Sequence, residues 1–163
     1  SVSSAVSILD ETSREVQSEG WHFNTEKDVK YSPDASNKTI TVGSDILEID
    51  AVDPSIDIVQ RGTQLFDRGE NTTEFDNDIK VNLIRLLTFT TLPETARRYI
   101  TLRASRVLQA RLIGSKELES LIARDEYQAR ARLLDADGSN SDATIFNSYD
   151  TATRVGINRS SYI

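Results

Sequence analysis

The first residues of the chain carry a hydrophobic stripe of helical period. Apolar and small residues recur there at alternating spacings of four and three, and the stripe consists of Val2, Val6, Leu9, Ser13 and Val16. Gly20 follows at the position where a residue in the left-handed conformation commonly ends a helix. The pattern predicts a helix over residues 3–19.

Residues 21–91 have the pattern of short strands separated by turns. Apolar stretches at 39–42 and 46–49 are separated by a Gly-Ser-Asp turn. Residues 58–61 and 64–67 flank Gly62-Thr63, which predicts a hairpin with a two-residue turn. After a polar loop, a further strand is expected between residues 79 and 89. This region is predicted to be a small antiparallel sheet or sandwich inserted between helices.

A helical hairpin is predicted over residues 93–136. Pro93 and Glu94 suit the first turn of a helix, and Gly114 followed by Ser115 suits a break between two helices. The apolar stripe of the first helix is Ala96, Ile100, Ala104, Val107, Leu108 and Leu112. The second helix is expected to bury Leu118, Leu121, Ile122, Ala129 and Leu133.

The character of the chain changes after residue 136. Residues 137–142 are polar and linker-like, and the apolar residues beyond them follow no period. We therefore expect an α+β fold with one domain at 1–136 and an extended tail at 137–163. Spaced apolar residues without a period are typical of a segment that orders on a partner. The candidate anchors are Ile145, Phe146, Tyr149, Tyr162 and Ile163.

Composition narrows the classes of function. At 163 residues and 37% apolar, the chain suits one globular domain, and it has no cysteine for a disulfide or a thiolate site. No apolar run approaches the ~20 residues of a membrane span, so no membrane partner is expected. The net charge of −7 divides into −10 for residues 1–80 and +3 for residues 81–163. Such a bipolar chain can associate with a complementary surface, although chance segregation of solvated charges gives the same pattern.

The sequence contains little that points to catalysis, a metal or a cofactor. The single histidine, His22, follows Trp21 and has no triad pattern near it. Residues 45–57 hold several carboxylates, which fit either a solvated face or an acid/base pair of a glycosidase. Residues 135–146 resemble a calcium loop only superficially, because the glycine and glutamate positions hold Asn140 and Phe146.

The arginines of the first hairpin helix are the main candidates for an interface. Five lie in an interval without an acidic residue, and they are Arg97, Arg98, Arg103, Arg106 and Arg111. They could face DNA phosphates, an acidic partner or solvent. Arg97 and Arg111 fall within the apolar stripe, where an unpaired guanidinium is costly. We therefore expect those two to find carboxylates, within the chain or on a neighbouring subunit.

Two segments resemble a known family. Gly20-Trp21-His22-Phe23-Asn24 forms a turn after the first helix, and Val81-Asn82-Leu83-Ile84-Arg85-Leu86 leads through Pro93-Glu94 to an arginine-rich helix. In this order they resemble the tail tubular protein A family, the ring-forming head-to-tail adaptors of short-tailed phages. The resemblance covers roughly residues 5 to 136. Family members usually have a further helix before this point, so we expect a segment to precede Ser1.

The resemblance implies a structural virion protein without catalytic residues, metal or cofactor. It implies a homo-oligomeric ring, a dodecamer as in the family, between the portal protein and the tail nozzle protein at the head-tail junction. Duplex DNA would pass through the channel without specific binding, and the protein would be made in the host bacterial cytoplasm. The five arginines become candidates for the subunit interface, and the anchors of the tail become candidates for binding the portal.

Two other classes remain open. One is a carbohydrate-active enzyme of the phage tail, with a paired-carboxylate cleft in the strand region. The other is a DNA-binding module that uses Arg98, Arg103 and Arg106.

Overall fold

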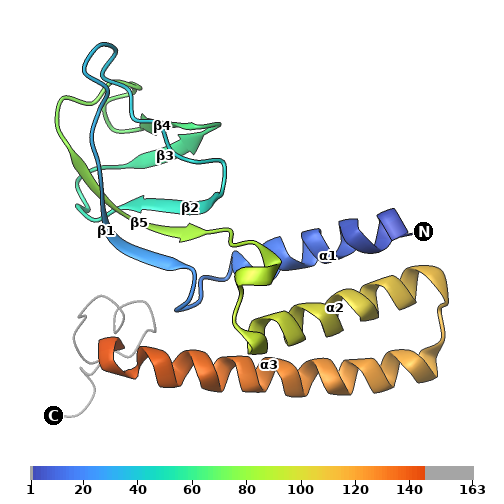
Figure 1. The fold of residues 1–163 in the computed structure, drawn as a ribbon. Coiled ribbons are helices and arrows are strands. Elements are labelled where there is room, and N and C mark those ends of the chain that lie inside the picture. The colour runs from blue at the N-terminus through green and yellow to red at the C-terminus, as the bar shows by residue number, and fades with distance from the viewer. Residues whose placement is uncertain (1, 146–163) are drawn as a thin grey trace, which may run out of the picture.

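The structure is a computed structural model that describes residues 2–145, with side chains described as far as residue 140. It confirms the predicted α+β fold, with the sheets at one end and the helices at the other (Figure 1). The described elements are α1 Val2–Gln17, β1 Thr25–Tyr31, β2 Ile46–Ala51, β3 Ile58–Arg61, β4 Gln64–Asp67, β5 Ile79–Arg85, the 3-10 turn η1 Phe89–Thr91, α2 Glu94–Leu112 and α3 Lys116–Ile145.

The strands form two small antiparallel sheets. One has the order β1-β5-β2, and the other is the β3–β4 hairpin, whose turn places Gly62 at φ +62° as the sequence predicts. Residues 39–42 make only isolated bridges through Thr39 and Thr41, where we expected a strand. Both sheets cover one core, which contains Ile40, Val42, Ile46, Ile58, Leu65, Phe75, Ile79, Val81 and Leu83.

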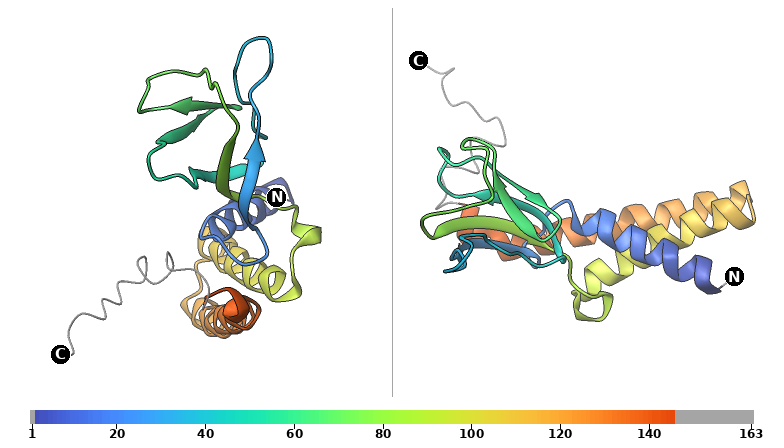
Figure 2. Two further views of the ribbon diagram at one scale, coloured as in Figure 1. Left: turned by 90° about the vertical axis from the view of Figure 1, so that its left-hand side faces the viewer. Right: turned by 90° about the horizontal axis from the view of Figure 1, so that it is seen from above.

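The helices form a separate layer with α2 in contact with both α1 and α3. Figure 2 shows α1 crossing the α2–α3 hairpin, so that the ends of α1 and α2 separate from each other. Ala96 and Ala129 are almost fully buried within this layer. The helical core consists of Val16, Trp21, Leu92, Ala96, Tyr99, Ile100, Ala129 and Leu133.

Several helical residues that were expected to be buried are exposed. Val2 and Val6 are exposed, whereas Ser13 and Val16 of the same predicted stripe are buried, together with Ile8, Thr12 and Gln17, which the stripe did not include. In the same way Leu112, Leu118 and Leu121 are exposed, while Ala129 and Leu133 are buried as predicted. The crossing of the helices explains this, because the end turns extend past the point where a neighbouring helix can cover them.

The third helix is longer than the sequence predicts. It continues through residues 137–145, where we expected the polar linker. Within this part the Asp137 carboxylate accepts a hydrogen bond from the backbone N–H of His22, at 2.6 Å between N and Oδ1. This contact attaches α3 to the turn after α1. Ile145 is the last residue of α3, and Phe146, Tyr149, Tyr162 and Ile163 lie outside the described residues.

A fully buried glutamine joins the helical layer to the last strand. Gln17 donates from Nε2 to the carbonyl oxygen of Leu87 at 3.0 Å and accepts at Oε1 from the Leu87 N–H at 2.8 Å. Leu87 lies just after β5, so this pair of hydrogen bonds fixes the end of α1 against the segment that leads to α2. One side chain satisfies both backbone groups of Leu87.

The turn after α1 is fixed by a second buried amide. Asn24 donates from Nδ2 to the carbonyl oxygens of Gln17 and Arg85, at 2.9 and 3.0 Å. Its Oδ1 accepts from the Trp21 N–H at 2.8 Å, while the Trp21 indole N–H donates to the Val16 carbonyl at 2.7 Å. The tryptophan is therefore both an apolar core residue and a hydrogen-bonded end to α1.

Gly20 is required in this turn for two reasons. Its φ is +76°, which is a conformation that disfavours side chains. A Cβ atom at this position would also lie 2.7 Å from Cδ1 of Ile84 on β5. A larger residue here would therefore adopt a strained backbone conformation and would also require the Ile84 side chain to shift.

Replacing Gln17 with leucine is expected to lower the free energy of unfolding by about 2–4 kcal/mol, because it leaves the N–H and carbonyl of Leu87 buried without partners. Urea denaturation followed by circular dichroism measures the change. The matched control is Gln128→Leu on the exposed side of α3, which should stay within about 0.5 kcal/mol of the wild type. Equal losses for both variants would contradict the role given to Gln17.

Candidate assembly surfaces

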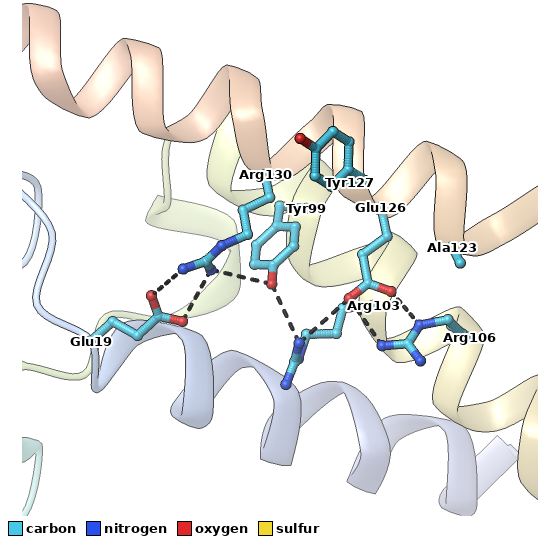
Figure 3. Close-up of a pocket in the computed structure, with 8 residues that line it drawn as sticks. All are labelled: Glu19, Tyr99, Arg103, Arg106, Ala123, Glu126, Tyr127 and Arg130. Atoms are coloured by element: carbon cyan, nitrogen blue, oxygen red, sulfur yellow. Dashed lines mark hydrogen bonds and ion pairs between the residues drawn. The ribbon is translucent and has the colours of Figure 1, made fainter.

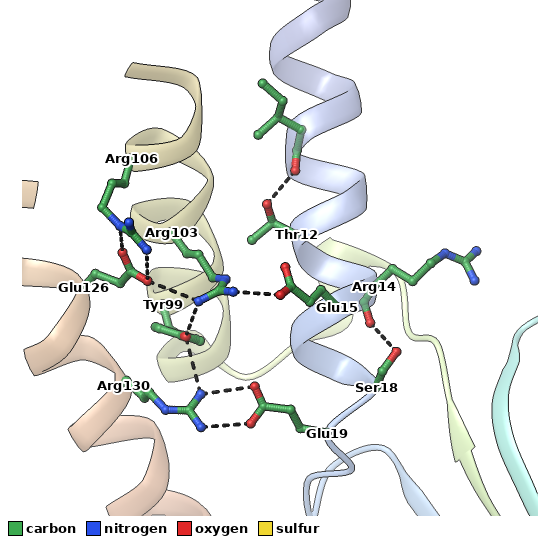
Figure 4. A network of polar contacts seen from close by, with 11 residues as sticks. Thr12, Arg14, Glu15, Ser18, Glu19, Tyr99, Arg103, Arg106, Glu126 and Arg130 are labelled. Atoms are coloured by element: carbon green, nitrogen blue, oxygen red, sulfur yellow. Dashed lines mark hydrogen bonds and ion pairs between the residues drawn. The ribbon is translucent and has the colours of Figure 1, made fainter. Parts of the chain in front are cut away.

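Two arginines of α2, Arg103 and Arg106, take part in a polar network between the three helices. Arg103 donates to Glu15 of α1 at 2.7 Å and to Glu126 of α3 at 3.4 Å (Figure 4). Arg106 donates to both oxygens of the same Glu126. Glu126 is buried, so two guanidinium groups compensate one carboxylate that is removed from water. The hydrogen bond to Glu126 raises the pKa of Arg106 above its usual value.

A third arginine extends this network along α3. Arg130 binds Glu19 through two N–O contacts of 3.2 and 3.0 Å, which is the bidentate arrangement typical of a strong arginine–carboxylate pair. Its guanidinium carbon also lies 5.8 Å from the ring centre of Trp21 and 5.6 Å from that of Tyr99. The hydrogen bond to Glu19 raises the pKa of Arg130.

These side chains surround an open hollow of about 420 Å³ on the helical layer (Figure 3). Tyr99 lies at its centre, where its hydroxyl group is 3.4 Å from both Arg103 Nη1 and Arg130 Nη1. Each arginine around the hollow already has a carboxylate partner within the chain. The network therefore serves first to hold α1, α2 and α3 together, rather than to bind a free anion.

The five predicted arginines divide into two groups. Arg103 and Arg106 are held in the network, and Arg97 pairs with Glu94 one turn earlier in α2 at 2.6 Å. Arg98 and Arg111 are exposed and make no ion pair with any described residue. Arg97 has the carboxylate that its place in the stripe led us to expect, whereas Arg111 has none within the described part of the chain.

Sequence reasoning missed the partners of these arginines, although one of them left a signal. Glu126 occupies a position in the helical series formed by Ile122, Ala129 and Leu133, so its spacing alone places a carboxylate on the inward face of α3. Arg130, Glu15 and Glu19 carry no such signal. Their roles depend on how the three helices cross.

Exposed aliphatic side chains gather at the end of the helical layer farthest from the sheets. The N-terminus of α1 and the α2–α3 turn lie at this end (Figure 1). The exposed apolar residues there are Val2, Val6, Leu112, Ile113, Leu118 and Leu121. Such a group of aliphatic side chains is typical of a surface that another protein covers.

Two of the carboxylates of residues 45–57 are held by other groups in a way that does not suit a general acid. Asp45 binds Arg85 at 2.7 Å, and this hydrogen bond lowers the pKa of the Asp45 carboxyl below its usual value. A general acid of a glycosidase needs the opposite shift. Asp53 is used locally, because it accepts from the backbone and hydroxyl of Ser55 and its pKa is lowered by these bonds.

The described residues form neither a metal site nor a membrane span. No three His, Asp or Glu side chains in that part of the chain lie together in a way that could hold a metal ion. None of its helices has the length and the apolar character that crossing a membrane requires. His22 is exposed and contributes to the structure through its backbone N–H.

Replacing Glu126 with glutamine is expected to lower the free energy of unfolding by about 1–2 kcal/mol, because Arg103 and Arg106 lose charge-assisted hydrogen bonds to a buried carboxylate. Thermal and urea denaturation measure the loss. Asp125→Asn removes the neighbouring exposed carboxylate and should change stability by less than about 0.5 kcal/mol. If the two variants are equally stable, the network does not hold the helices together.

A sequence model of the family described as tail tubular protein matches residues 1–143, which is most of the chain. No match was found among curated proteins. The chain belongs to the tail tubular protein family, and it is a structural component of a phage tail and not an enzyme.

Proposed function

We propose that the chain is the subunit of a ring that joins the portal protein to the tail nozzle protein and surrounds the DNA channel. In this proposal identical subunits assemble side by side through their helical layers, as a dodecamer at the head-tail junction of the virion. Duplex DNA passes through the ring without specific binding. Membership of the tail tubular protein family carries the proposal.

Exposed aliphatic side chains and arginines without ion pairs among the described residues support an assembly role. The helical layer has a stable interior, yet it exposes six large aliphatic side chains at one end. Arg98 and Arg111 on α2 also lack ion pairs with the described residues. Arginine is enriched in protein interfaces, and a group of exposed aliphatic side chains is typical of a surface that another protein covers.

The joint between helices and sheets supports a mechanical role. Gln17 and Asn24 tie α1, β5 and the turn at Trp21 through buried hydrogen bonds. A subunit built this way holds its two ends at a fixed angle. An adaptor needs this property, because it must present one end to the portal and the other to the nozzle at the same time.

The alternative of a DNA-binding module has less support. It requires Arg98, Arg103 and Arg106 to face phosphates, but Arg103 and Arg106 bind Glu15 and Glu126. Residues 21–91 also carry 13 acidic and 7 basic side chains, which repel a duplex. The enzyme alternative is replaced by the structural role of the family.

Native mass spectrometry of the purified full chain tests the ring directly. We expect one closed oligomer, and twelve chains of 18.2 kDa give about 218 kDa. Negative-stain microscopy should show particles with a central channel. A chain that stays monomeric at every accessible concentration, with and without portal protein, would contradict the proposed function.

Deleting residues 146–163 is expected to leave the ring intact and to weaken its binding to portal protein at least tenfold. The reason is that this segment holds the proposed anchors Phe146, Tyr149, Tyr162 and Ile163. Native mass spectrometry measures the ring, and pull-down or interferometry with purified portal protein measures the binding.

A matched pair of variants separates the anchors from the segment as a whole. Phe146→Ser with Tyr149→Ser should reduce binding to the portal, whereas Asn158→Ala with Ser160→Ala should not. Portal binding that survives the full deletion would show that the portal contacts a different part of the chain.

A further inference from the structure

The end of the helical layer has two features that are complementary to each other. The first is the hairpin tip, residues 113–121, which connects α2 to α3 and exposes Ile113, Leu118 and Leu121. Ile113 is 69% exposed and Leu121 is 61% exposed, although both are large aliphatic residues. The chain belongs to a family whose members assemble with other virion proteins. In water these side chains favour a partner that removes them from solvent.

The second feature is a cleft between α1 and α2. The two helices cross, and the N-terminal half of α1 separates from the C-terminal end of α2 (Figure 2). The space between them is about 350 Å³, which lies within the roughly 300–1,000 Å³ of binding clefts. Its lining combines aliphatic with polar and charged side chains, and it consists of Ser4, Ser7, Ile8, Glu11, Leu108, Arg111 and Leu112.

The charges of the cleft and the tip complement each other. Glu11 and Arg111 line the cleft, and neither makes an ion pair with a described residue. The tip carries Lys116 beside Glu117 and Glu119, which likewise make no ion pair in the described part of the chain. A tip that enters the cleft can therefore offer a cation to Glu11 and a carboxylate to Arg111, on either side of its aliphatic residues.

We propose that the hairpin tip of one copy of this chain occupies the α1–α2 cleft of the next copy. The contact joins two different surfaces of the same molecule, so each copy keeps a free tip and a free cleft until the chain of subunits closes. This inference rests on the proposed ring and names the contact that would build it. The tip binds through its aliphatic side chains, and the flanking charges set its orientation.

The test uses two variants, each of which disables one side of the contact. Leu118→Arg with Leu121→Arg changes the tip, and Ser7→Arg fills the cleft from its rim. All three positions are exposed, so the fold should be retained, and circular dichroism with a thermal melt checks this. Analytical ultracentrifugation and native mass spectrometry measure the oligomeric state.

Each variant alone should lose the ring and sediment as a monomer, with self-association weakened at least tenfold. A mixture of the two should form a 1:1 pair and stop there. The intact tip of the Ser7→Arg chain fits the intact cleft of the other variant, while the two remaining surfaces are blocked. Only a contact between a tip and a cleft on different copies gives this behaviour.

The matched controls change the same residue types elsewhere on α3. Leu134→Arg replaces an exposed leucine away from the tip, and Ser139→Arg replaces an exposed serine near the other end of the helix. Both should assemble as the wild type does. Rings formed by either test variant, or a mixture that remains monomeric, would overturn the proposed contact while leaving the ring function standing. A wild-type chain that forms no oligomer would instead overturn the ring function, and this contact with it.

Discussion

The structure depends on the buried hydrogen bonds of Gln17 and Asn24. These two amides connect the end of α1, the turn at Trp21 and the end of β5, which are the three segments where the helical layer meets the sheets. A backbone group that is buried loses its hydrogen bonds to water, and these side chains replace them. Removing the side chain therefore leaves the backbone group unsatisfied, at the full free-energy cost of its desolvation. Because the bonds have fixed geometry, they also set the angle between the two parts of the subunit, which hydrophobic packing alone specifies less strictly.

The helical layer is stabilised by apolar packing together with ion pairs between the helices. Its apolar core combines buried alanines with larger residues. Arginines of α2 and α3 reach carboxylates of α1 and α3 across the seams, and Tyr99 lies between the two halves of this network. Most of these groups are partly exposed, so their ion pairs add little to the free energy of unfolding. Their main effect is to fix the positions of the helices. The same fixed positions leave one end of the layer uncovered.

This division between a rigid interior and an uncovered end fits a protein whose function is to assemble. The sheets form a separate acidic part, and the helices carry the exposed aliphatic groups and two arginines that make no ion pair within the described part of the chain. A tail tubular protein has no reaction to catalyse, and the described residues accordingly devote their buried polar groups to structure. Even Asp45, which sequence alone leaves open as a candidate acid, is committed to Arg85.

The sequence by itself determined most of the elements and several of the breaks between them, but not the absence of a strand at residues 39–42 or the continuation of α3 through residues 137–145. Helical spacing, the β3–β4 turn at Gly62, and the glycines at positions 20 and 114 depend on local backbone conformation, which neighbouring residues specify directly. The tertiary structure alone decided which stripes are covered. Val2, Val6, Leu118 and Leu121 follow the same period as buried residues, yet they are exposed because the helices cross and leave their ends without a neighbour. The crossing also decided that Arg103 and Arg106 bind Glu15 and Glu126, since a sequence gives the spacing of charges along one helix but not the distance between two helices.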